Sequence, residues 1–176
     1  MESPSDVVLL PDAGPLITLA YADVLDHLFK PGWPVVLVDM VLHEVTRNQT
    51  PTSEKLAYWL KEKEIPILPT KIFRRYQPPP IESGASSRKA HLGELAIQEA
   101  MSEFALMQPP RTGVFLFEDH KIAGASFLLP SNCRKVSTRA FLIFLEQNGW
   151  IASASEIERS AIQAGRAFSQ MRFPLE

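Results

Sequence analysis

Several features that mark specialised proteins are scarce in this sequence. It has one cysteine, Cys133, so no disulfide can form within a chain. No apolar run approaches the roughly 20 residues of a membrane-spanning helix, and the acidic start MESPSD differs from a signal peptide. These absences predict a protein of a reducing compartment that has no membrane contact, and we expect it in the cytoplasm.

An excess of one charge is also lacking. The 18 lysines and arginines nearly balance 20 acids, and the net charge is −2. A nucleic-acid-binding protein of this composition would have to concentrate its basic residues on one face. Neither GxxxxGK[ST] nor GxGxxG occurs, which excludes the common phosphate-binding loops, and the four histidines have no zinc-site spacing.

The remaining pattern predicts an α/β fold. With 176 residues, 45% of them hydrophobic, the chain is long enough for one domain over 1–176. Apolar runs predict strands, and amphipathic segments between them predict helices. Strands are expected at 7–11, 34–39, 65–68 and 112–119, and 125–130 is either a weaker strand or a short apolar piece of loop. Helices are expected at 14–29, in one piece or two, and at 40–48, 51–63, 92–107, 137–149 and 153–168. Wholly apolar strands that alternate with helices are typical of a parallel sheet covered on both faces, a three-layer α/β/α sandwich.

One segment has the composition of a loop. Residues 77–90, QPPPIESGASSRKA, contain three prolines, three serines and a glycine. We expect this segment to be flexible and exposed, because it cannot supply a buried face. Arg74, Arg75, Arg88 and Lys89 bracket it, either as solvated charges or as contacts to a nucleic-acid backbone.

Acidic residues stand at or near the ends of the predicted strands. Asp12 ends the first strand, and Glu44 lies one turn into the helix after the second. Glu94 lies near the start of the helix before the fourth strand, which itself ends in Glu118 and Asp119. Since parallel sheets place their sites beyond the carboxyl ends of the strands, these acids are expected to converge.

Each acid also has a purely structural interpretation. Asp12 is suited to cap the helix that follows it, and Glu94 to stabilise the first turn of its helix. Glu44 is compatible with a solvated helix position, although it lies beside the apolar face of its helix. Glu118 and Asp119 are compatible with a turn or a helix cap.

A gathering of all these acids would need a cation. Carboxylates brought into one cleft repel each other and lose hydration. Oxygen ligands without cysteine or clustered histidine favour Mg²⁺ or Mn²⁺. The sequence therefore predicts a divalent-metal site at the sheet edge.

Four stretches in this order resemble a PIN domain. They are LLPDAGPLITLA, VDMVLHEV, HLGELAIQEA and FLFEDHKIAG, and VSTRAFLIFLEQNGWI fits the closing helix, so that the resemblance covers residues 7–166. The chain resembles the VapC-like toxins, and especially a PIN subfamily with a Gly-Glu helix start.

The resemblance implies a metal-dependent endoribonuclease that hydrolyses RNA phosphodiester bonds. It assigns Asp12, Glu44, Glu94 and Asp119 as catalytic metal ligands, with Glu118 as the alternative to Asp119, and Mg²⁺ or Mn²⁺ as the cofactor. In that family an aspartate is common just before the Gly-Glu pair, whereas this chain has Ala90 and His91 there. A PIN-like module that binds RNA or protein without cleaving is therefore the alternative function.

The resemblance also implies partners. RNA would be the substrate, an antitoxin protein would hold the toxin inactive, and the chain would form a homodimer. A phosphoacceptor receiver domain also has acids at its strand ends, but it requires an aspartate after the third strand, where this chain has Pro69.

Overall fold

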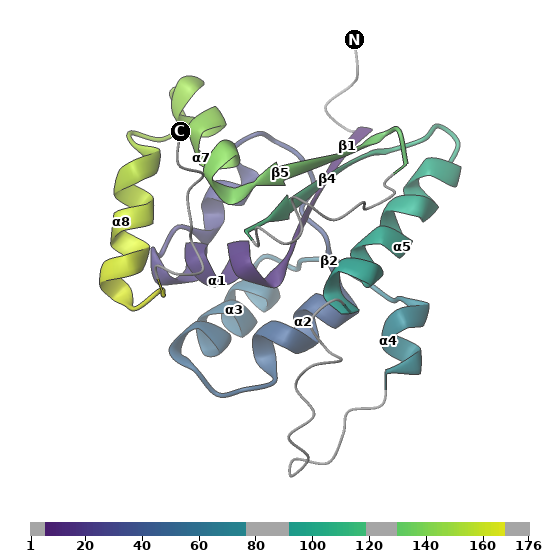
Figure 1. Cartoon of the computed structure of the whole chain (residues 1–176), viewed down its shortest axis with the longest axis horizontal. Helices are drawn as coiled ribbons and strands as arrows, with labels where there is room; N and C mark the ends of the chain where they lie inside the picture. Colours follow the sequence, from purple (N-terminus) through teal and green to yellow (C-terminus); the bar gives the residue numbers. More distant parts are fainter. Residues whose placement is uncertain (1–5, 77–91, 119–129, 168–176) are drawn as a thin grey trace.

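The structure is a computed structural model of the chain, and it describes residues 6–76, 92–118 and 130–167 (Figure 1). The elements alternate in the α/β manner: β1 (Val7–Pro11), α1 (Ala13–Tyr21), the 3₁₀ helix η2 (Leu25–Phe29), β2 (Leu37–Val38), α2 (Asp39–Thr46), α3 (Pro51–Glu62), β3 (Ile67–Leu68), α4 (Lys71–Arg75), α5 (Leu92–Leu106), β4 (Thr112–Phe117), β5 (Cys133–Ser137), α7 (Thr138–Gln147) and α8 (Ala154–Ala164). The predictions for 77–90, for Asp119 and for a strand at 125–130 fall wholly or almost wholly outside the described residues.

All strand pairs of the described residues are parallel. β1, β4 and β5 form a sheet in that spatial order, and β2 pairs with β3. A parallel bridge between Leu9 and Val35 links the two groups, with the Leu9 N–H donating to the Pro34 carbonyl and the Val36 N–H to that of Leu9. The predicted α/β class with a parallel sheet is confirmed.

The central strands carry the core. Leu9 and Leu10 of β1 and Phe115 and Leu116 of β4 are at most 1% exposed. Figure 1 shows α1 and α8 side by side, and α5 on the other side of β1 and β4 in this view. This arrangement is compatible with a three-layer sandwich.

Most helices begin where polar side chains can cap them. Thr50 and Ser53 form a reciprocal capping box with Pro51 at the first position of α3. Ser137 caps α7, and Ser153 caps α8. Local sequence therefore sets these helix starts, as the pattern predicted.

Three details differ from the sequence predictions. β5 and α4 were not predicted, and β2 and β3 are only two residues long. The sequence suggests Asp39 as the N-cap of the helix predicted at 40–48, but Asp39 is the first residue of α2. Its carboxylate accepts hydrogen bonds from the N–H and the hydroxyl of Thr70, both at 2.7 Å. A tertiary contact therefore uses the side chain that local reasoning assigned to a cap.

No helix within the described ranges is both long enough and apolar enough to cross a membrane.

Candidate functional site

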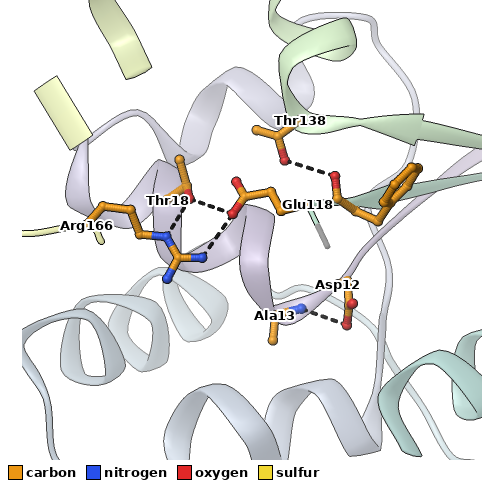
Figure 2. A network of polar contacts seen from close by, with 7 residues as sticks. Asp12, Ala13, Thr18, Glu118, Thr138 and Arg166 are labelled. Atoms are coloured by element: carbon orange, nitrogen blue, oxygen red, sulfur yellow. Dashed lines mark hydrogen bonds and ion pairs between the residues drawn. The ribbon is translucent and has the colours of Figure 1, made fainter. Parts of the chain in front are cut away.

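Asp12 leaves β1 at the carboxyl edge of the sheet and caps α1. Its Oδ1 accepts a hydrogen bond of 2.9 Å from the N–H of Ala13 (Figure 2). Its own N–H donates to the carbonyl of Leu116 in β4, which fixes the chain at the strand end. The capping interpretation is therefore confirmed, and it leaves the proposed ligand role untested.

Glu44 and Glu94 are brought close together by α2 and α5. The Glu44 carboxylate lies on Gly93, where an added methyl group would be 3.0 Å from Oε2 and 3.2 Å from Oε1. The N–H of Gly93 bonds to this carboxylate, and the charge of the neighbouring Glu94 acts on it. The absence of a side chain at Gly93 therefore leaves room for the Glu44 carboxylate, which any larger residue at position 93 would displace.

Both members of this acid pair are removed from solvent. Glu94 is 7% exposed, and Glu44 is partly buried. Burial raises the pKa of Glu44 from 4.5 to about 7; the charge of Glu94 also raises it, while Arg47 and the Gly93 N–H oppose the rise. Two glutamates at one place, one of them ionising only near neutral pH, form an environment that favours a cation.

Glu118 follows β4 at the same edge, but its carboxylate is engaged by other groups. Oε2 accepts hydrogen bonds of 2.9 Å from the Thr18 hydroxyl and from Nη2 of Arg166 (Figure 2). The side chains of Glu118 and Arg166 are each 9% exposed. Arg166 Nε donates to the Thr18 hydroxyl at 2.9 Å, which closes a three-residue network. Oε1 of Glu118 is buried and has no partner in the described structure.

Gly14 makes the position of Glu118 possible. A methyl group on Gly14 would lie 3.2 Å from Cβ and 3.3 Å from Oε2 of Glu118. The Asp-Ala-Gly sequence after β1 thus has a packing reason as well as a capping one. Figure 2 shows the Glu118 side chain running toward Thr18 and Arg166, away from Asp12.

The structure therefore describes four of the five predicted site residues. It brings Glu44 and Glu94 together, places Asp12 at the end of β1, and gives Glu118 a cationic partner. Asp119 lies outside the described residues. Within those residues, no group of three or more His, Cys, Asp or Glu side chains is arranged to hold a metal ion.

Sequence reasoning missed Arg166 and Thr18. Arg166 is 148 residues from Thr18 and 48 from Glu118, so no local pattern connects them.

Comparison with known proteins gives no further guidance: the chain matches no protein-family model, no curated protein and no solved structure. The likeness to PIN domains therefore rests on the four sequence stretches and enters the functional assignment only as a proposal.

Proposed function

We propose that the protein is a divalent-metal-dependent endoribonuclease of the PIN type, which hydrolyses phosphodiester bonds of RNA. The observation that carries the proposal is the acid pair of Glu44 and Glu94, held together over Gly93. A buried pair of carboxylates is costly for a fold and is typical of a site that binds a cation.

The residues fit Mg²⁺ or Mn²⁺. Mg²⁺ is commonly held by one or two carboxylates and retains several waters, so a third protein ligand is not required. Glu44 and Glu94 would hold the ion, and the resemblance adds Asp12 and Asp119. Glu118 is the weaker candidate, because Arg166 already neutralises its charge at 2.9 Å.

The chemistry needs no side-chain nucleophile. A bound divalent ion activates water and offsets the charge that develops on the phosphate. The chain itself supplies three things: carboxylates at the edge of a rigid parallel sheet, a helix start without a side chain at Gly93, and a cap at Asp12 that fixes the end of β1. These groups orient the site before substrate arrives.

The finer assignments belong to the same proposal. RNA as substrate, an antitoxin protein as partner, a homodimer and a cytoplasmic location are supported by the resemblance and by the composition of the chain. The parallel α/β fold is compatible with all of them.

The decisive experiment measures cleavage of a labelled single-stranded RNA pool by EDTA-treated protein with and without Mn²⁺. We expect cleavage only with Mn²⁺, and loss of at least a hundredfold in rate for Glu44→Gln and Glu94→Gln. Glu103→Gln is the matched control, because Glu103 is an exposed glutamate on the same helix α5. Equal rates in all four proteins would refute the site.

The same assay separates the alternative, a module that binds without cleaving. Such a module would bind the RNA and leave it intact at every Mn²⁺ concentration, and its affinity would not depend on Mn²⁺.

A further inference from the structure

A groove opens beside Glu44. It has a volume of about 350 Å³ and lies between α1, the end of α2, the start of α3 and the residues that follow α8. Glu44 forms part of its wall, so the groove reaches one member of the acid pair. This volume is at the small end of those that hold ligands, and it suits a single strand rather than a duplex.

Two arginines from distant parts of the chain line this groove. Arg47 follows α2 and is exposed, and Arg166 follows α8. The charge of Arg47 reaches Glu44, whose pKa it lowers against the larger effect of burial. The side chains of Asn48, Thr50 and Tyr21 add polar groups to the lining.

Arg166 is held in place before any ligand binds. Its Nε and Nη2 donate to Thr18 and Glu118, both at 2.9 Å. Figure 2 shows the third nitrogen, Nη1, on the side of the guanidinium away from Thr18 and Glu118. A guanidinium with one edge fixed loses little entropy when the other edge binds an anion, and its planar fork matches phosphate oxygens.

We propose that this groove binds the phosphate groups of a single RNA strand, through Arg47 and Arg166, and leads the strand to Glu44. The inference rests on the proposed function for the identity of the strand. Arginine, hydroxyl and amide groups are the side chains that most often contact phosphate oxygens in nucleic-acid complexes. Glu118 and Thr18 then serve as positioning residues that orient Arg166.

Binding can be measured apart from catalysis. Fluorescence anisotropy with a labelled 2′-O-methyl RNA oligonucleotide in EDTA gives the Kd at several salt concentrations. We expect Arg47→Gln to raise the Kd by about threefold to tenfold. The slope of log Kd against log salt should fall by about 0.7, as for one lost phosphate contact to a single strand.

Arg111→Gln is the matched control. Arg111 is exposed and precedes β4, at the end of that strand opposite Glu118, and it does not line the groove. The substitution removes the same charge, so it should leave the Kd within about twofold and the salt slope unchanged. Arg166→Lys keeps the charge but removes the fork, so it should raise the Kd and leave the salt slope close to that of wild type, in protein whose folding has been verified by its melting curve.

The outcomes separate the two proposals. Equal Kd changes in Arg47→Gln and Arg111→Gln, or a wild-type protein that does not bind the oligonucleotide, would overturn the groove assignment and leave the nuclease proposal to its own assay. Binding that follows the predicted pattern, in a protein that never cleaves RNA with Mn²⁺, would support the groove and refute the nuclease.

Discussion

Glu118 and Glu44 lie near the same edge of the sheet but have different electrostatic partners. Glu118 has its own cation, because Arg166 and Thr18 both bond to Oε2 at 2.9 Å. Glu44 instead lies next to a second acid, Glu94, and its pKa rises to about 7, chiefly through burial. The difference shows that the charge of Glu118 is compensated within the fold, whereas Glu44 is packed beside another acid.

The largest effect is expected when Arg166, the cationic partner of Glu118, is replaced. Arg166→Met should leave the Glu118 charge buried without compensation and lower the free energy of unfolding by about 3–5 kcal/mol. The double variant Glu118→Gln/Arg166→Met should recover most of this loss. Urea unfolding of both variants at pH 7 measures the effect, and a loss below 1 kcal/mol in Arg166→Met would show that the ion pair contributes little.

The acid pair should respond in the opposite direction. A Glu44 pKa raised from 4.5 to about 7 means that ionising this group destabilises the metal-free fold. The associated stability is present below pH 4.5 and is lost as the pH rises through 7, on the order of 3 kcal/mol in full. Glu44→Gln should therefore be the more stable protein above pH 7, by about 1–3 kcal/mol, and equal to wild type near pH 4.

Urea unfolding of metal-free protein across pH 4–9 measures this difference. Glu118→Gln is the matched control, since it makes the same chemical change at the neutralised acid and should destabilise the protein. A Glu44→Gln protein that is less stable than wild type at pH 8 would show that the Glu44 charge is already compensated.

Thr18→Val should have a smaller effect. Thr18 is fully buried, and valine has nearly its shape, so packing is preserved. The variant loses the hydroxyl that bonds both Glu118 and Arg166, at a cost of about 1–2 kcal/mol. Thermal unfolding measures it, and an unchanged melting temperature would mean that the hydroxyl only fills space.

The smallest changes in stability are expected at the two glycines that contact these acids, Gly93 beside Glu44 and Gly14 beside Glu118. Gly93→Ala gains less than about 1 kcal/mol of helix propensity, because Gly93 lies in the first turn of α5. Its methyl group would displace the Glu44 carboxylate, whose oxygens would lie at 3.0–3.2 Å. We expect a net change below about 1 kcal/mol and a weaker stabilisation by Mn²⁺. Gly14→Ala contacts Glu118 instead and should leave the Mn²⁺ effect as in wild type, with both effects measured by melting curves.

The sequence predicted what depends on local pattern and on the rule for strand ends. β1, α3, α5 and α7 appear within two residues of their predicted bounds, because apolar periodicity and capping residues mark them. The convergence of Glu44 and Glu94 followed from placing acids at one edge of the sheet. Asp12, which has both a cap and a ligand interpretation, is confirmed only as a cap.

What the sequence could not predict has identifiable physical causes. β5 stands at the end of the strand order β1-β4-β5, and it carries Arg134 and Lys135, so it lacks the apolar run of a central strand. The pairing of Glu118 with Arg166 joins segments that only the folded chain brings together. The contact of Glu44 with Gly93 depends on how α2 meets α5, and no spacing within either helix records it.

We propose that the pair of Glu44 and Glu94 binds a divalent cation, whereas Glu118 does not. The most direct test of this proposal is the melting temperature at pH 8 with and without Mn²⁺ for wild type, Glu44→Gln and Glu118→Gln. At a hundredfold excess of Mn²⁺ over Kd, binding to the folded state alone stabilises it by about 2.7 kcal/mol. We expect this stabilisation in wild type, the same gain in Glu118→Gln from a lower starting temperature, and almost none in Glu44→Gln. A full Mn²⁺ shift in Glu44→Gln, or its loss in Glu118→Gln, would contradict it.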